Sequence, residues 1–212
     1  MEKKLDIPFY KNGENGRQCM QIAMRIVLKY FTNQDYSLEE LDKITQRKEE
    51  FWTWTSQGVT GLYDLGLKIK YFSKEDLKPF LEGEPFIRKH FGKDADKILK
   101  FTDLPVLINS IDKLINKNIF EKRILSLSEI EKHILKGHVP IVLIDNNKVS
   151  GKRDLYQGHY VVLTGFNDND IYYHDSGPTD ALPNKKVPRE RFIEAFNANG
   201  TDNDVIIVYG KR

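Results

Sequence analysis

The chain has 212 residues, of which 40% are hydrophobic and 30% charged, so it can build a folded core and lacks the composition of a disordered protein. Its 33 Lys and Arg residues nearly balance 31 Asp and Glu residues, and a net charge of +2 gives no general electrostatic reason to expect nucleic-acid binding. The single cysteine excludes an internal disulfide bond and a metal site built from several cysteines.

The first residues of the chain indicate its compartment. Residues 1–8 carry charges but no apolar stretch after them, so they do not read as a signal peptide. No run approaches the roughly 18 apolar residues that indicate a membrane span. We therefore expect a cytoplasmic protein that binds neither membrane nor nucleic acid, and the sequence leaves its oligomeric state open.

The first third of the chain predicts a short strand followed by helices. Residues 6–10 predict a lead-in strand, and the Asn- and Gly-rich residues 12–16 predict a loop. Residues 18–31 predict an amphipathic helix, because apolar side chains recur there at three- and four-residue spacing. Ser37 and Glu40 form a capping-box pattern, which starts a second helix that we expect to end near Arg47.

The middle of the chain is predicted to be mainly helical. A helix over residues 59–65 should end at Gly66, and residues 68–72 alternate as a strand does. Residues 73–77 predict a short helix. Residues 80–124 are charged and helical in character, and we interpret them as an insertion.

Strands dominate the last part of the chain. The predicted elements there are a helix over 128–137, a buried strand over 139–144, strands over 159–166 and 171–174 joined by a turn at 167–170, a helix over 187–197 and a strand over 205–209. Helices therefore gather in the first half and strands in the second. This segregation predicts an α+β fold with an antiparallel sheet.

Cys19, His159 and Asp175 are the candidate catalytic residues. A thiol in the first turn of a helix lies near unpaired N–H groups, which favour the thiolate. His159 follows Gly158 and opens a strongly apolar strand, so it is a candidate base, and Asp175 is a candidate partner that orients the ring. The alternatives are an inert packing cysteine, a structural histidine and a turn aspartate.

Strand geometry gives a condition for Asp175. Side chains alternate between the faces of a sheet, so Asp175 must lie opposite Val161 to reach His159 on the same face. We expect a hairpin loop with an odd number of residues, which pairs either Gly165 with Ile171 or Phe166 with Asp170. Pairing of Phe166 with Ile171 would instead turn Asp175 away from His159.

Acyl transfer also needs donors for the negative charge that builds on the carbonyl oxygen. The backbone N–H of Cys19 is one candidate, and the side chains of Asn12 and Gln18 are two more. His174 should point to the sheet face opposite Asp175, and we interpret it as structural or surface-exposed. No histidine has metal-ligand spacing, so no metal and no cofactor is predicted.

The chain resembles the peptidase C39-like family of papain-like cysteine proteases. The resemblance is strongest in the Gly-His-Tyr-Val-Val block of residues 158–162 and in residues 172–178. It extends to residues 6–10, to Cys19 at the start of a long helix, and to residues 141–144 and 192–196. It implies a papain-like fold in which Cys19 is the nucleophile, His159 the general base and Asp175 the orienting group. Asn12 stands in the place of the family's oxyanion-hole glutamine.

These observations predict one papain-like domain over residues 1–212, with a helical insertion at about 80–124. The predicted function is a cysteine peptidase or amide hydrolase that acts on a peptide or another amide-containing substrate through a thioester. Two alternatives stay open. One is a catalytically inactive C39-like fold used as a binding module, and the other is a cysteine acyltransferase or deamidase.

Overall fold

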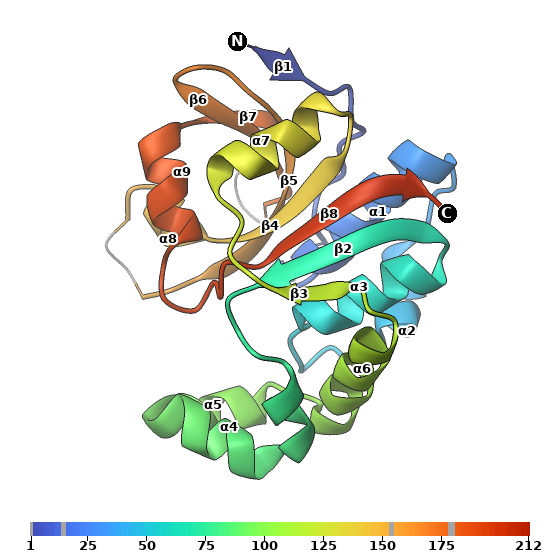
Figure 1. Ribbon diagram of the computed structural model, residues 1–212, viewed down its shortest axis with the longest axis vertical. Helices are drawn as coiled ribbons and strands as arrows, with labels where there is room; N and C mark the ends of the chain where they lie inside the picture. Colours follow the sequence, from blue (N-terminus) through green and yellow to red (C-terminus); the bar gives the residue numbers. More distant parts are fainter. Residues whose placement is uncertain (1, 14–15, 153–154, 178–180) are drawn as a thin grey trace.

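The computed structural model describes residues 2–13, 16–152, 155–177 and 181–212 (Figure 1). The helices are α1 (Cys19–Thr32), α2 (Leu38–Thr45), α3 (Thr55–Asp64), α4 (Glu84–Phe91), α5 (Ala95–Lys100), α6 (Leu104–Asn116), α7 (Leu127–Leu135), α8 (Asn146–Val149) and α9 (Arg189–Phe196), with short 3₁₀ turns η1 (Lys78–Glu82) and η2 (Gly92–Asp94). The strands are β1 (Lys3–Lys4), β2 (Leu67–Ser73), β3 (Phe120–Lys122), β4 (Val139–Asp145), β5 (Gly158–Phe166), β6 (Asp170–Asp175), β7 (Leu182–Pro188) and β8 (Val205–Lys211).

The strands of the described residues form one sheet in the order β3-β2-β8-β4-β5-β6-β7, and β1 pairs with β5. All neighbours are antiparallel except β2 and β3. In Figure 1, α7 crosses in front of the sheet, whereas α1 lies behind β8. The predicted α+β fold with a mainly antiparallel sheet is confirmed.

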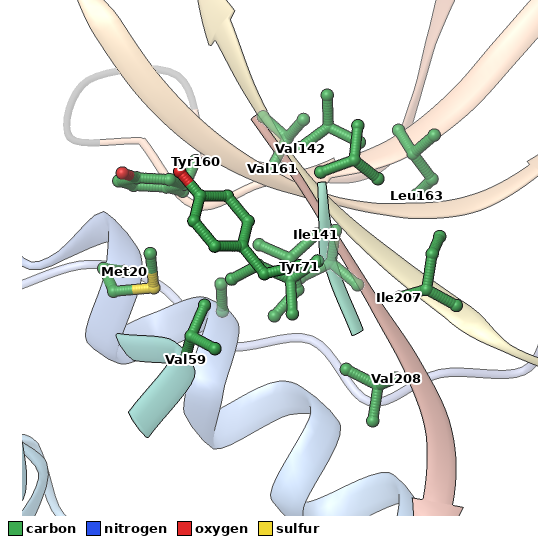
Figure 2. Packing of buried hydrophobic residues seen from close by; sticks show 14 of the residues in the cluster. Met20, Val59, Tyr71, Ile141, Val142, Tyr160, Val161, Leu163, Ile207 and Val208 are labelled. Carbon is green, nitrogen blue, oxygen red and sulfur yellow. The ribbon is translucent and has the colours of Figure 1, made fainter. Parts of the chain in front are cut away.

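The core lies between α1, α3 and the sheet. Figure 2 shows Met20 of α1 and Val59 of α3 against Tyr71, Ile141 and Tyr160 of the strands, and all five side chains are buried. This packing follows from the apolar face that the spacing in α1 predicts. Among the described residues, no helix combines the length and the apolar character needed to cross a bilayer.

Capping explains where the short helices begin. The predicted capping box of α2 is confirmed, because the Ser37 hydroxyl accepts from Glu40 N and the Glu40 carboxylate accepts from Ser37 N. The helix α3 begins at Thr55 rather than at residue 59. The side chain of Gln57 accepts from Trp54 N at 2.8 Å and so caps a turn that the aromatic sequence hides.

Several predicted elements differ from the structure. The lead-in strand predicted over residues 6–10 is absent. The N-terminal strand is β1, which ends at Lys4, before the predicted range begins. Residues 73–77 form no helix. The strand β7 was not predicted, because prolines and exposed polar residues give it the pattern of a sheet edge. Within the predicted loop 12–16, residues 14 and 15 lie outside the described residues.

The segment interpreted as an insertion is mostly helical, as predicted. It contains α4, α5 and α6 and ends in β3, which pairs with β2 and so belongs to the sheet. The helix α6 packs on α3, whereas α4 and α5 project away from the sheet (Figure 1).

The predicted register of the β5–β6 hairpin is wrong at its turn but right at the site. Phe166 pairs with Ile171, which is the register that would turn Asp175 away. A β-bulge at Thr164 then shifts the pairing by one residue, so that Val162 pairs with His174. The next residue, Asp175, therefore falls opposite Val161 and on the same face as His159.

Gly165 beside this bulge is required for the contact with β1. A Cβ atom there would overlap the carbonyl oxygen of Lys3 and come within 2.9 Å of Lys4 Cα. We expect Gly165→Ala to lower the free energy of unfolding by about 1–3 kcal/mol, measured by urea denaturation. Thr164→Val is the matched variant, because it removes a buried hydroxyl that has no partner. It should be neutral or stabilising, and an equal loss in both variants would contradict this explanation.

Candidate active site

Cys19 is the first residue of α1 and is partly buried as a residue. Burial alone would raise the pKa of its thiol. The hydrogen bond with the His159 ring, the charge of that ring, and the backbone N–H groups of Tyr160 and Met20 outweigh burial and lower the pKa. The thiol therefore ionises more easily than an ordinary cysteine does.

His159 lies between Cys19 and Asp175. Its ring is almost fully buried, and Nε2 lies 3.0 Å from Asp175 Oδ1, which leaves Nδ1 as the nitrogen for Cys19. Burial disfavours the charged ring. The hydrogen bonds to Asp175 and Cys19 nevertheless raise the pKa of His159 to about 9. The ring is therefore largely protonated near neutral pH, and its positive charge favours the thiolate of Cys19.

Asp175 ends β6 and is held from three sides. Its Oδ1 accepts from His159 and from Gly177 N at 3.1 Å, and its Oδ2 lies 2.7 Å from Lys185 Nζ. Burial favours the neutral carboxyl, but His159 and Lys185 together bring the pKa of Asp175 far below its usual range. Lys185 was not among the predicted site residues, because it belongs to the unpredicted strand β7.

The two side chains predicted as oxyanion donors, Asn12 and Gln18, differ in their surroundings. Asn12 N donates to Ser176 O at 2.9 Å, next to Asp175, and the buried Asn12 Nδ2 atom has no hydrogen-bond partner among the described residues. An unpaired buried donor costs folding free energy, which makes Asn12 Nδ2 the better candidate. Gln18 Nε2 instead donates to Asp42 Oδ2 at 2.8 Å, so the Gln18 amide is engaged away from the triad.

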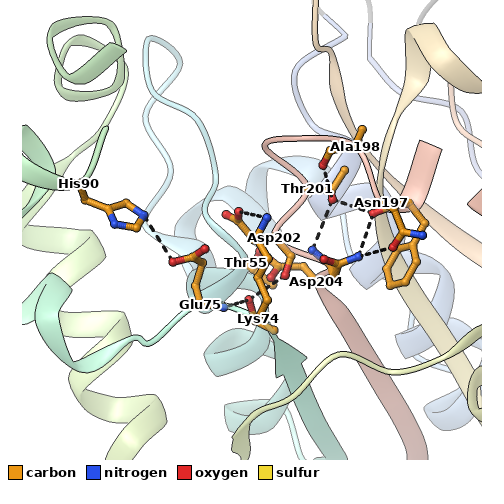
Figure 3. Close-up of polar contacts among 12 residues, drawn as sticks. Thr55, Lys74, Glu75, His90, Asn197, Ala198, Thr201, Asp202 and Asp204 are labelled. Atoms are coloured by element: carbon orange, nitrogen blue, oxygen red, sulfur yellow. Dashed lines mark hydrogen bonds and ion pairs between the residues drawn. The ribbon is translucent and has the colours of Figure 1, made fainter. Parts of the chain in front are cut away.

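A buried polar network lies behind the nucleophile. Asp204 accepts hydrogen bonds from Thr55 and from Tyr71, the latter at 2.8 Å, and Thr55 Oγ1 lies 2.6 Å from the Tyr160 hydroxyl. Figure 3 shows Thr55 and Asp204 close together within a wider set of polar contacts. Burial raises the pKa of Asp204 to about 7. The network supports Tyr160, whose backbone N–H faces the thiol of Cys19.

The other histidines lie apart from the triad. His174 Nε2 bonds the carbonyl oxygen of Ile7 at 3.0 Å and its Nδ1 accepts from Asn184 N at 3.1 Å, so both ring nitrogens of this buried residue serve the fold. His90 contacts Glu75 in Figure 3. Within the described part of the chain, no three His, Cys, Asp or Glu side chains are grouped so as to hold a metal ion.

Comparison with known proteins gives one family and one fold. A family model described as guanylylate cyclase matches residues 12–208. The peptidase domain of Streptococcus ComA, a bi-functional ABC transporter involved in a quorum sensing pathway, is 14% identical with a TM-score of 0.50, covering 99% of both chains. A candidate C39-like peptidase from Bacillus anthracis is 13% identical with a TM-score of 0.60, covering 100% of this chain and 98% of that one. Identities this low bear on the fold alone.

Proposed function

We propose that this chain, which belongs to the guanylylate cyclase family and shares the fold of C39 peptidase domains, hydrolyses amide or related acyl bonds with Cys19 as the nucleophile. The observation that carries the proposal is the His159 ring between the Cys19 thiol and the Asp175 carboxylate. A cysteine, a histidine and a carboxylate in this order are the parts of an activated thiol nucleophile.

The first half of the reaction forms a thioester. The Cys19 thiolate attacks the carbonyl carbon of the substrate, and the carbonyl π electrons move onto the oxygen. When that oxyanion collapses, the C–N bond breaks, and the His159 imidazolium gives its proton to the departing nitrogen. Asp175 accepts from the ring at Nε2, so it fixes which nitrogen faces the reaction.

Two groups support the proposed oxyanion position. The backbone of Asn12 is bonded to Ser176, which follows Asp175, and the Asn12 Nδ2 atom has no partner among the described residues. The start of α1 supplies backbone N–H groups near Cys19. Preorganised donors of this kind stabilise the charge that appears only in the transition state. Asn12 therefore takes the role that the sequence resemblance assigns to its position.

The second half releases the acyl group. Neutral His159 takes a proton from water, the hydroxide oxygen attacks the thioester carbon, and the Cys19 thiolate leaves. An amine in place of water would give acyl transfer, and a primary amide as the substrate would give deamidation. We assign the thioester chemistry to the site and propose a peptide or another amide-containing compound as its substrate.

Alkylation of the only cysteine tests the proposal. Because any alkylation reports on Cys19, the rate of reaction with iodoacetamide from pH 4 to 10 gives the ionisation of this thiol directly. We expect rapid alkylation well below pH 8 in the native protein and an ordinary titration near 8.5 in urea. Cys19→Ser should not react. A native thiol that titrates near 8.5 would contradict the proposal and favour the alternative of a catalytically inactive binding module.

The family description raises a second candidate, the cyclisation of a guanylyl nucleotide. A thiol hydrolase and a nucleotide cyclase differ in their dependence on Cys19. We expect the native protein to turn over a fluorogenic peptide or thioester panel and Cys19→Ser to be inactive. Formation of cyclic GMP from GTP at equal rates in the native protein and in Cys19→Ser would favour the cyclase instead.

A further inference from the structure

Lys185 makes a side-chain contact with the triad that the proposed reaction does not use. Its Nζ atom lies 2.7 Å from Asp175 Oδ2, the carboxylate oxygen that does not face His159. The Asp175 side chain is 6% exposed and that of Lys185 is 24% exposed, so this ion pair is largely shielded from water. Such a pair interacts more strongly than a surface salt bridge does.

One bulge and one stretch of regular pairing place Lys185 on the face of the triad. The bulge at Thr164 in β5 aligns Asp175 with His159, and a second register shift separates the Tyr173–Lys185 pair from the Asp175–Leu182 pair. The second shift coincides with Asn184, whose φ is +50°. Lys185 pairs with Tyr173 on the face that Asp175 shares, and its ammonium lies 5.9 Å from the Tyr173 ring centroid.

Three neighbouring strands therefore each contribute one charged side chain to a row of alternating charges. His159 lies on β5, Asp175 on β6 and Lys185 on β7, with Cys19 of α1 beyond His159. The other ionisable groups that sense this row are tyrosines. Burial raises the pKa of Tyr156, Tyr160 and Tyr173 well above its ordinary value, and a charge of the triad adds to this effect: Cys19 for the first two, Asp175 for Tyr173.

We propose that Lys185 is a positioning residue that acts on the reaction through Asp175. Its ammonium group balances part of the carboxylate charge and so weakens the stabilisation that Asp175, bound at Nε2, gives to the positive charge of the His159 imidazolium, whose Nδ1 proton is the one transferred. This inference rests on the proposed function. Its consequence is that His159 gives up its proton more readily to the departing nitrogen, because a general acid works best when its proton is not held too tightly.

The geometry of Asp175 does not depend on Lys185 alone. Gly177 N and His159 both bind Oδ1, so removal of Lys185 leaves the carboxylate facing the ring. We therefore expect Lys185→Met to raise the midpoint of the His159 titration by about half a unit to one unit, since the carboxylate loses its counter-charge. The readout is the Cε1–H NMR signal of His159, assigned by its absence in His159→Asn.

Lys186→Met is the matched control. Lys186 is the next residue on β7, and its side chain lies 3.0 Å from Asp170 and is 61% exposed. Lys186→Met should leave the midpoint of the His159 titration unchanged. Lys185→Arg keeps the charge and should give the wild-type midpoint. If Lys185→Met does not fold, Lys185→Gln removes the charge with a polar side chain in its place.

The outcomes separate this inference from the proposed function. A His159 midpoint that is unchanged or lower in Lys185→Met would overturn the role of Lys185, because loss of a merely structural contact releases Asp175 from the ring. An equal shift in Lys186→Met would also overturn it. Failure of the proposed function would instead appear in the wild-type protein, as an ordinary Cys19 titration with iodoacetamide.

Discussion

Replacing His159 by asparagine is expected to slow the alkylation of Cys19 at pH 6 by about 100-fold. The ring lowers the pKa of the thiol through a hydrogen bond and through its positive charge. In the variant, burial raises that pKa and only the backbone N–H groups of Tyr160 and Met20 oppose it. A thiol with a pKa of about 8.5 or above is less than about 1% thiolate at pH 6. The measurement is the second-order rate constant with iodoacetamide.

His138→Asn is the control for this substitution. His138 lies near the start of β4, six residues before Ile144, which pairs with His159. Loss of this distant ring should leave the alkylation rate of Cys19 unchanged. A rate in His159→Asn within about threefold of the wild-type rate at pH 6 would show that the ring does not activate the thiol.

The regular elements could be predicted because burial imposes a period on the sequence. The apolar face of α1 and the continuous apolar run of β4 are properties of the local sequence, and the structure buries both. The strand β7 has no such signal. Only Val187 of its residues is buried, and Pro183 and Pro188 break the pattern of a strand, so its pairing with β6 decides its structure.

The residues of the site could be predicted from the sequence, but the register of the β5–β6 hairpin that positions them could not. Cys19, His159 and Asp175 lie together, but Asp175 reaches His159 through a bulge at Thr164 rather than through the turn. Gly165 inside an apolar strand was the available signal, because a glycine there often marks a bulge or a close backbone approach. Nothing in the sequence near Lys185 indicated that it pairs with Asp175.

The second large effect that we expect concerns Asp204 and the pH dependence of stability. The pKa of this carboxyl is raised to about 7 by burial, whereas an unfolded aspartate titrates near 3.9. Between about pH 4 and pH 7 the folded protein therefore holds a proton that the unfolded chain releases. This difference makes the Asp204 contribution to the free energy of unfolding fall as the pH rises.

Asp204→Asn should remove that contribution, because asparagine stays neutral. Its oxygen can accept from Tyr71 and its amide can donate to Thr55, which can then donate to Tyr160, so the hydrogen bonds of the network can be kept. We expect the free energy of unfolding of the variant, relative to that of the wild type, to rise by about 2–4 kcal/mol from pH 4 to pH 8. The measurement is urea denaturation at each pH.

The difference between the two proteins isolates Asp204, because carboxylates with lowered pKa values, such as Glu129, contribute equally to both. Asp112→Asn, at an exposed position on α6, is the matched control. Its free energy of unfolding relative to the wild type should not change with pH. A difference between Asp204→Asn and wild type that stays constant from pH 4 to pH 8 would mean that Asp204 is already ionised in the folded protein. The Thr55 and Tyr71 hydroxyls would then be donors to a buried carboxylate anion behind the nucleophile.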